Sequence, residues 1–384
     1  MNSLLFVTTI PATVSSFFVP IAHHLQAQGW QVDAMANGIS SNPKCLETFD
    51  CVWDVDLSRN PLDPRNLLVA RQQIRKILAE KHYDIVNVST PVAAFVTRYA
   101  LNDLRKNGLK LIYTAQGFHF YRGGATVKNS IFRTLEVIAA PWTDYLVVVN
   151  REDEAAAKRI IPSERVRYIP GTGVNLDRYN PDNIAASEIE QVRENLGLKP
   201  DNPLFLSIAE FIPRKHHRDI LIAFAKLNKP EVHLAFAGDG RLLEQMKQLA
   251  SNLGIEDRVH FLGFRKDIPI LMRASTATIL ASEQEGLPNC VMESICLETP
   301  VIGTDIRGTR DLLEEGNGLL FQVGDVDGLA GAMTWVLDRP EEVKMMGKRG
   351  RERMAAYGLP QILKQYEDLY AEALEKENYA AFDG

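Results

Sequence analysis

The feature that most constrains the fold is a repeated alternation of short apolar runs with helix-like segments. In residues 277–304, an apolar run at 277–280 ends in a polar loop, a second apolar stretch begins at Cys290, and a third run occupies 300–304. Short buried runs joined by helical segments are typical of parallel strands with crossover helices. This stretch therefore predicts a strand, a loop, a helix and a second strand.

The same rhythm recurs along the whole chain. It begins with strands expected at 4–7 and 30–36 around a helix at 17–28, a βαβ unit that predicts a parallel sheet. Further strands are expected at 84–88, 109–114, 145–149, 166–169, 204–208, 232–237 and 318–321. A polar connector at 182–203 divides the series, and an amphipathic helix at 360–375 follows it. The prediction is an α/β protein with two domains.

Composition agrees with a two-domain globular protein. The chain has 384 residues, of which 46% are hydrophobic and 24% charged, and no apolar run reaches the roughly 18 residues needed to span a membrane. The N-terminus lacks the basic start of a signal peptide. The four cysteines show no CxxC or Cys/His spacing, so neither disulfides nor a metal site are expected.

Charge is distributed unevenly. Residues 1–180 contain 20 Lys and Arg against 16 Asp and Glu, and the remainder contains 23 against 33. A mildly basic first half would suit an anionic lipid or an anionic acceptor. Ordinary surface charge explains the asymmetry equally well. Neither half is basic enough to indicate a nucleic-acid partner.

Two glutamates stand out in the stretch around Cys290. Glu285 and Glu293 are eight positions apart, so a helix that begins near Asn289 would place Glu285 in the preceding loop and Glu293 in its first turns. A helix N-terminus carries about half a positive charge and suits a diphosphate, whereas carboxylates accept hydrogen bonds from sugar hydroxyls. This combination describes a nucleotide-sugar site. The alternative is a cap at Glu285 and a solvated helix face at Glu293.

The surrounding motifs resemble the donor-site signature of glycosyltransferase family four. They are Glu-Gly-Leu-Pro-Asn at 285–289, Met-Glu-Ser at 292–294 and Thr-Pro-Val-Ile-Gly-Thr at 299–304. The resemblance implies a retaining enzyme of the GT-B fold, in which two Rossmann-like domains face each other across a cleft. It implies an acceptor-side domain at 1–178, a donor domain at 179–359 and a C-terminal helix within 360–384 that crosses back to the first domain.

The resemblance also assigns the residues that hold the donor diphosphate. The family usually has an arginine and, five residues later, a lysine. Here the lysine matches Lys215, while Glu210 replaces the arginine and Arg214 compensates for it. A carboxylate beside a diphosphate is costly unless it is paired, so Glu210 is expected to pair with Arg214, Lys215 or another base. The alternative for Arg214 and Lys215 is a solvated turn.

Further donor contacts are implied along the second domain. Gly238 allows close approach of the backbone, and the backbone at Phe264 and Arg265 would contact the nucleobase. The helix N-terminus would neutralise the leaving diphosphate through Gly286, Leu287, Pro288 and Asn289.

The two glutamates complete the donor contacts that the resemblance implies. Glu293 would hold the ribose hydroxyls, and Glu285 would hold the hydroxyls of the transferred sugar near the reaction centre. Because cations and N–H groups stabilise the leaving group and no DxD motif is present, neither a metal nor a cofactor is expected.

The acceptor-side domain contains a second informative stretch at 115–124. It follows an expected strand and places His119 between two aromatic residues. The run resembles the Gly-Phe-His-Phe-Tyr segment of capsule and exopolysaccharide glycosyltransferases, in which a histidine is expected at Gln116. Either Gln116 supplies the hydrogen bond as an amide, or His119 has the polar role. The alternative is a histidine packed within an aromatic cluster.

The function predicted from these features is a retaining transfer of sugar from a nucleotide-diphosphate sugar, UDP-linked, to a saccharide or lipid-linked saccharide in polysaccharide biosynthesis. The protein is expected in the cytoplasm, with peripheral membrane contact through its first domain. Two alternatives are a nucleotide-sugar epimerase of the same fold and a non-catalytic sugar-nucleotide-binding protein. A dinucleotide-dependent oxidoreductase is excluded because no glycine triplet follows the first strand.

Overall fold

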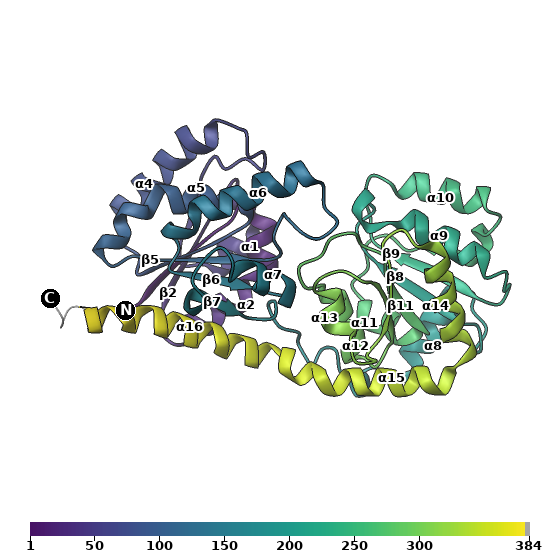
Figure 1. Ribbon diagram of the computed structural model, residues 1–384. Helices are drawn as coiled ribbons and strands as arrows, with labels where there is room; N and C mark the ends of the chain where they lie inside the picture. Colours follow the sequence, from purple (N-terminus) through teal and green to yellow (C-terminus); the bar gives the residue numbers. More distant parts are fainter. Residues whose placement is uncertain (381–384) are drawn as a thin grey trace. The chain divides into compact units, whose positions relative to one another are not determined.

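The chain forms two compact units, each built on its own parallel sheet (Figure 1). The computed structural model describes residues 1–380, and side chains as far as residue 375. Unit 1 contains Met1–Gly173 and the chain from Pro360 onward, and unit 2 contains Val174–Leu359. The predicted α/β class is therefore confirmed in both units.

Unit 1 is organised around a seven-stranded parallel sheet with the order β3-β2-β1-β4-β5-β6-β7. Its strands are β1 (Ser3–Val7), β2 (Gln31–Ala36), β3 (Val52–Asp54), β4 (Ile85–Ser89), β5 (Lys110–Ala115), β6 (Tyr145–Val148) and β7 (Val166–Tyr168). Every residue of β1 and β4 is buried. Such continuous burial is expected for central parallel strands covered by helices on both faces.

Helices form two hydrophobic cores with this sheet. One core includes α4 (Arg71–Glu80), α5 (Pro91–Leu101) and α7 (Arg151–Ala157). The other includes α1 (Pro11–Phe17), α2 (Val19–Ala27), α3 (Pro43–Thr48) and α16 (Leu359–Ala380). The remaining long helix, α6 (Thr126–Ala139), packs on α5. These elements make unit 1 a layered α/β domain.

The C-terminal helix packs on unit 1, as the sequence predicts. Tyr366 and Tyr370 of α16 are fully buried in the second core, and the Asn87 side-chain amide donates to the Tyr370 hydroxyl at 2.7 Å. Residues 381–384 of the predicted C-terminal segment lie outside the described part of the chain.

The structure corrects the first predicted helix and adds elements that were not predicted. The expected helix at 17–28 corresponds to α2, and a separate helix that was not predicted, α1, precedes it and ends at Phe17. Pro20 lies in the first turn of α2. Because proline has no backbone N–H to donate to a carbonyl oxygen of α1, the helical hydrogen bonds are interrupted and the two helices separate just before Pro20. Strand β3 and helices α3, α5 and α6 were not predicted.

Unit 2 contains a six-stranded parallel sheet with the order β10-β9-β8-β11-β12-β13. Its strands are β8 (Leu204–Ile208), β9 (His233–Ala237), β10 (Val259–Phe261), β11 (Ala277–Leu280), β12 (Val301–Thr304) and β13 (Leu319–Phe321). Its helices are α8 (Ala186–Asn195), α9 (His217–Lys226), α10 (Leu243–Asn252), α11 (Ile268–Ala274), α12 (Asn289–Cys296), α13 (Thr309–Leu313), α14 (Val326–Asp338) and α15 (Pro340–Arg353). Within residues 1–380, no helix is both long and apolar enough to cross a lipid bilayer.

An ion pair between α5 and α6 is buried inside unit 1. The Arg98 guanidinium donates to the Glu136 carboxylate at 2.8 Å and to the Thr143 hydroxyl at 3.1 Å. It also lies 4.3 Å from the centre of the Tyr113 ring. Arg98 is only 1% exposed, so its charge depends on these partners.

Glu136→Gln is expected to lower the free energy of unfolding of unit 1 by about 3 kcal/mol, because it leaves the Arg98 charge buried without a counter-ion. Urea unfolding monitored by circular dichroism measures the change. The exposed pair of Arg75 and Asp103 provides a control, since Asp103→Asn should cost less than about 1 kcal/mol. Equal losses in the two variants would contradict the structural role of the buried pair.

Candidate functional site

The candidate site of unit 2 is centred on an ion pair between Lys215 and Glu285. The Lys215 ammonium and the Glu285 carboxylate are in direct hydrogen-bond contact, and their side chains are 14% and 13% exposed. Lys215 ends the short helix η7 (Pro213–Lys215), which follows β8, and Glu285 lies in the loop after β11. Since β8 and β11 are adjacent parallel strands, both loops leave the same edge of the sheet.

Backbone contacts join these two loops. The Arg214 guanidinium donates to the Gln284 carbonyl oxygen at 3.1 Å, and the Glu283 amide donates to the Arg214 carbonyl oxygen at 2.9 Å. The structure therefore brings Arg214, Lys215 and Glu285 together, although 70 residues of sequence separate the last two.

Glu210 does not pair with a base, and the predicted pairing is wrong. In the described part of the chain its carboxylate makes no ion pair or hydrogen bond, while Arg214 and Lys215 contact the loop at 284–285 instead. The side chain is exposed. An exposed carboxylate keeps its hydration, so the desolvation cost on which the prediction rested does not arise.

Glycines allow these loops to approach one another closely. A Cβ on Gly238 would lie 2.1 Å from the Ala209 carbonyl oxygen, at the point where the loops after β8 and β9 meet. A Cβ on Gly308, whose φ is +70°, would lie 1.9 Å from the Gly286 carbonyl oxygen. The backbone at Gly308 therefore packs directly against the backbone at Gly286, where a side chain would not fit. Gly308 was not among the residues predicted from the sequence, although a glycine in a short loop after a strand often marks such an approach.

Helix α12 begins at Asn289, as predicted, with Pro288 at its N-cap and no capping side chain. Its first backbone N–H groups are therefore available at the end of the Glu285 loop. Leu287 packs partly into the core beneath the helix.

Glu293 lies one turn into α12, beside the Tyr179 phenol, a neighbour that no sequence motif indicated. Burial raises the pKa of the Glu293 carboxyl, whereas the Tyr179 hydrogen bond and the nearby Arg178 charge lower it in part. Tyr179 lies just before the polar connector at 182–203, more than 100 residues from Glu293 in the sequence, and no motif marks it.

Phe264 and Arg265 lie in the loop after β10. Phe264 is 81% exposed, and the Arg265 guanidinium pairs with the Asp267 carboxylate through a 2.8 Å contact from Nε. The Gly238 amide donates to the Gly263 carbonyl oxygen at 2.8 Å, which connects this loop to the one after β9. The predicted base-contacting residues thus belong to the same sheet edge as Gly238.

Unit 1 places Gln116 and His119 in the loop that follows β5. The His119 ring lies 5.1 Å from the Phe132 ring, and Phe118 and Phe120 stack at 4.6 Å. The Gln116 amide nitrogen is buried without a hydrogen-bond partner. A buried orphan donor costs about 1–3 kcal/mol, and such groups are common where a ligand supplies the missing partner.

Metal ligands are not gathered at either location. Among residues 1–380, no group of three or more His, Cys, Asp or Glu side chains is arranged to hold a metal ion. At the candidate site of unit 2, the groups that could contact an anionic ligand include the cations Arg214 and Lys215 and the first N–H groups of α12.

Comparisons with known proteins match both halves of the chain. Residues 14–178 match the family described as Glycosyltransferase Family 4, and residues 188–353 match Glycosyl transferases group 1. EpsD of Bacillus subtilis (strain 168), a provisionally assigned glycosyltransferase, is 31% identical over 380 residues and 98% of each chain.

Two further comparisons concern a curated enzyme and a solved structure. The UDP-Gal:alpha-D-GlcNAc-diphosphoundecaprenol alpha-1,3-galactosyltransferase of Escherichia coli is 26% identical over 309 residues, 77% of each chain. The crystal structure of Anabaena HepE in complex with UDP has a TM-score of 0.80, at 20% identity, and covers 97% of this chain and 100% of that one. This structural likeness establishes the fold.

Tyr179→Phe is expected to make stability depend more steeply on pH. The raised pKa of Glu293 means that the fold favours its protonated carboxyl. The contribution of this group to the free energy of unfolding is therefore present below the ordinary glutamate pKa of about 4.3, and it is lost as pH rises through the pKa of the folded state. Without the phenol donor the pKa rises further and the loss grows. Urea midpoints at about pH 5 and about pH 8 measure it.

Tyr357→Phe, in the same unit, is the matched control because the Tyr357 hydroxyl makes no hydrogen bond within the described residues. If Tyr179→Phe and the control show the same pH dependence as the unmodified protein, Tyr179 does not control the ionisation of Glu293.

Proposed function

Because this chain belongs to glycosyltransferase family 4 and is a hexosyltransferase-type enzyme of the GT-B fold, we propose that it transfers a sugar from a UDP-sugar to a saccharide or lipid-linked saccharide with retention of configuration. The observation that supports this proposal most directly is the Lys215–Glu285 pair beside the uncapped N-terminus of α12. A cation, a carboxylate and free N–H groups are the donors and acceptors that a nucleotide-sugar requires.

The ion pair suggests how donor binding prepares the site. Without donor, Lys215 is held by Glu285. A diphosphate carries more negative charge than one carboxylate, so it competes for Lys215 and is held further by Arg214 and by the N–H groups of α12. Glu285 is then released to accept hydrogen bonds from the hydroxyls of the transferred sugar.

The other donor contacts follow from the positions of their loops. Glu293, held by Tyr179, accepts hydrogen bonds from the ribose hydroxyls. The backbone at Phe264 and Arg265 contacts the base, and Gly238 leaves room for the nucleotide. Glu210 is exposed at the end of β8, and we assign it a peripheral contact with donor hydroxyls.

The chemical step that we propose is front-face substitution. A diphosphate oxygen accepts the proton of the acceptor hydroxyl as that hydroxyl attacks, and the bond between the sugar and the diphosphate breaks on the same face. The negative charge that develops on the leaving diphosphate is stabilised by Lys215, Arg214 and the α12 N-terminus, without a metal. For unit 1, we propose that the buried Gln116 amide or His119 binds a sugar hydroxyl.

The acceptor that we propose is a sugar carried on a lipid diphosphate, within exopolysaccharide biosynthesis on the cytoplasmic face of a membrane. The name of the Escherichia coli relative specifies a diphosphoundecaprenol acceptor. An epimerase is not favoured, because the curated relatives compared above are named as glycosyltransferases.

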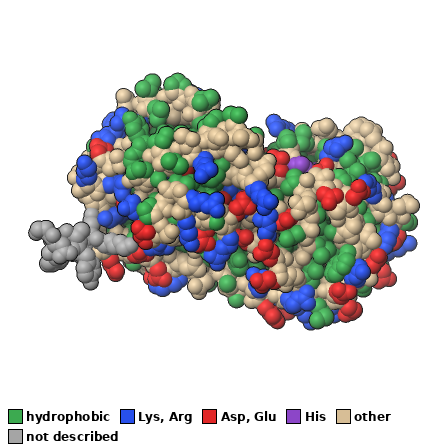
Figure 2. Space-filling model, in the orientation of Figure 1, with side chains coloured by type: hydrophobic (Ala, Val, Ile, Leu, Met, Phe, Trp, Pro, Cys, Tyr) green, Lys and Arg blue, Asp and Glu red, His purple; other side chains and the backbone are tan. Residues whose placement is uncertain are grey.

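Helix α6 provides the surface through which unit 1 would contact a membrane. Val127, Ile131 and Ile138 fall on one side of the helix and are 73%, 48% and 47% exposed. The single acidic residue of α6, Glu136, is buried. Figure 2 shows hydrophobic side chains on the exposed upper surface of unit 1. An apolar helix face without exposed carboxylates suits the interface of an anionic bilayer.

UDP is expected to raise the melting temperature of the protein, because a ligand that binds only the folded state stabilises it. Lys215→Ala should weaken UDP binding about thirtyfold, through loss of one charge-assisted contact. Glu285→Gln should bind UDP at least as tightly as the unmodified protein, since Lys215 is then free of its carboxylate, yet should lose sugar transfer. Calorimetric titration and release of UDP from UDP-sugars measure the two effects.

Lys247→Ala, which removes an exposed lysine of unit 2, is the control and should leave UDP affinity unchanged. No stabilisation of the unmodified protein by any nucleoside diphosphate would refute the donor site. Binding of UDP-sugars without transfer to any acceptor would instead favour the non-catalytic binding protein.

The double variant Val127→Ser with Ile131→Ser is expected to bind vesicles of phosphatidylglycerol and phosphatidylcholine about thirtyfold less tightly, through loss of roughly 2 kcal/mol of apolar burial. Vesicle sedimentation measures the partition. Met345→Ser, which removes an exposed apolar side chain of unit 2, should have no effect. Equal partitioning of all three proteins would exclude α6 as the contact surface.

A further inference from the structure

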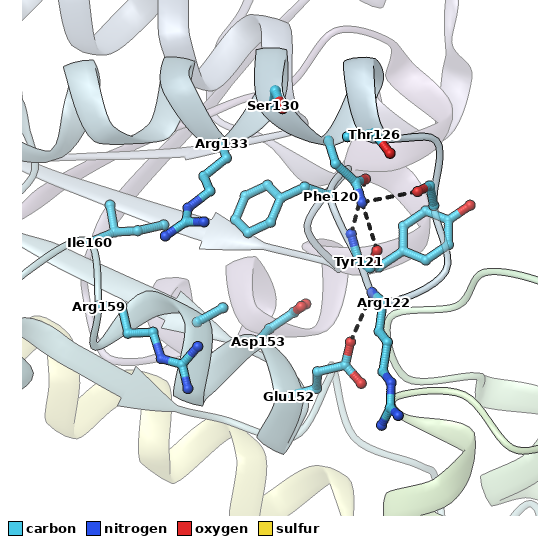
Figure 3. A pocket seen from close by; sticks show the side chains of 13 residues that line it. Phe120, Tyr121, Arg122, Thr126, Ser130, Arg133, Glu152, Asp153, Arg159 and Ile160 are labelled. Carbon is cyan, nitrogen blue, oxygen red and sulfur yellow. Dashed lines mark hydrogen bonds between the residues drawn. The ribbon is translucent and has the colours of Figure 1, made fainter.

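Unit 1 contains a pocket that none of the residues assigned above explains. It has a volume of about 340 Å³ and lies between α6, α7 and the loop after β5 (Figure 3). This volume is within the range of about 300–1,000 Å³ typical of small-molecule sites. The pocket therefore has room for a ligand of its own.

Arginines dominate the polar lining of this pocket. Arg133 extends from α6 and Arg159 from the chain after α7, and their guanidinium groups point into the same end of the pocket from opposite walls (Figure 3). Neither guanidinium makes an ion pair or a hydrogen bond within the described residues. A third arginine, Arg122, lies at the other end. Two cations that face one cavity repel each other, and a bound anion would relieve that repulsion.

The carboxylates that line the same pocket are engaged with other groups. Asp153 is buried and accepts hydrogen bonds from the Phe118 amide at 3.0 Å and the Asn150 side chain at 2.9 Å. Glu152 accepts from the Arg122 backbone amide at 3.4 Å. A hydrogen bond from a neutral amide leaves a carboxylate charged, so the lining carries three arginine charges against two carboxylate charges, a net charge of +1.

The pocket is formed in advance of ligand binding. The Asn129 side-chain amide donates to the Tyr121 carbonyl oxygen at 2.8 Å and to the Gly124 carbonyl oxygen at 3.3 Å, which fixes the loop against α6. A Cβ on Gly124 would lie 2.7 Å from the Asn129 amide oxygen, so a larger residue there would displace the Asn129 side chain. A preformed site avoids the cost of ordering this loop on binding.

Apolar groups adjoin the arginines. Phe120, Ala156 and Ile160 line the same pocket, and Phe120 lies beside Arg133 (Figure 3). The N-terminus of α6, which has no capping side chain, forms part of the opposite end. Cationic and apolar groups in one cavity match an amphiphile that joins a phosphate-type head to a hydrocarbon chain.

We propose that this pocket binds the diphosphate and the first carbons of the chain of a lipid-diphosphate-linked acceptor, with Arg133 and Arg159 as the residues that hold the diphosphate. The inference rests on the proposed function for the presence of such an acceptor, and it adds the site that recognises the lipid diphosphate. The arginines bind the substrate and take no part in the bond changes.

Geranyl diphosphate, a soluble probe, is titrated calorimetrically into the intact protein already saturated with UDP, so that the donor site is filled. The unmodified protein should bind it, and the double variant Arg133→Gln with Arg159→Gln should bind it about a hundredfold less tightly through loss of two charged contacts. The matched control, Lys128→Gln with Lys158→Gln, removes two exposed charges next to the same two helices but outside the pocket lining, and should bind as the unmodified protein does.

Two further probes separate the contribution of the diphosphate to the binding affinity from that of the hydrocarbon chain. Inorganic diphosphate should bind more weakly than geranyl diphosphate and show the same dependence on the arginines, and geraniol should not bind. Equal affinity of the double variant and the unmodified protein for geranyl diphosphate, or no binding by the unmodified protein, would overturn the proposal.

The result is independent of the donor site. UDP should still stabilise the arginine variant, which also shows that the variant is folded. Lys215→Ala should be stabilised less by the same UDP concentration and should retain geranyl diphosphate binding. Failure of the donor site and failure of the arginine pocket are thus distinguishable.

Discussion

Parallel pairing of β8 with β11 is the constraint on which the donor-side geometry depends. Parallel strands end at the same edge of a sheet, so the loops that follow them meet there whatever their separation in sequence. The short helix after β8 supplies Lys215, and the loop after β11 supplies Glu285. Any change in strand order would separate the two side chains. The strand order therefore places these two positions in contact, and the choice of Lys and Glu at them makes the contact an ion pair.

Electrostatics then decides which of the charged groups at this edge are paired. Lys215 and Glu285 are mostly shielded from water, so each requires the other until a ligand replaces it. Glu210, three residues before the start of η7, is exposed and needs no partner. Glu293 is intermediate: burial raises its pKa, and the Tyr179 hydrogen bond offsets part of that shift. The degree of solvation distinguishes three carboxylates that look alike in the sequence.

The sequence was sufficient to predict the two-sheet α/β architecture, because buried parallel strands appear as short apolar runs that can be recognised in a single sequence. It also predicted the start of α12, because an apolar stretch begins at Cys290 directly after the polar loop. It did not predict α6, whose exposed face carries Val127 and Ile131 and obscures the usual helical periodicity. Nor could it predict the contact between Tyr179 and Glu293, which depends on how an irregular segment of unit 2, distant in the sequence, packs beside α12.

The charged groups of unit 1 follow a different principle from those of unit 2. Arg98 is buried and fully partnered by Glu136, Thr143 and a backbone carbonyl, so its charge serves the packing of α5 against α6. Arg133, three residues before Glu136 on α6, is exposed to a cavity and has no partner in the described chain. Helix α6 therefore carries one arginine partner inside the core and one arginine that faces a preformed pocket. Substitution of Arg133 can alter ligand binding without removing any contact that stabilises the fold.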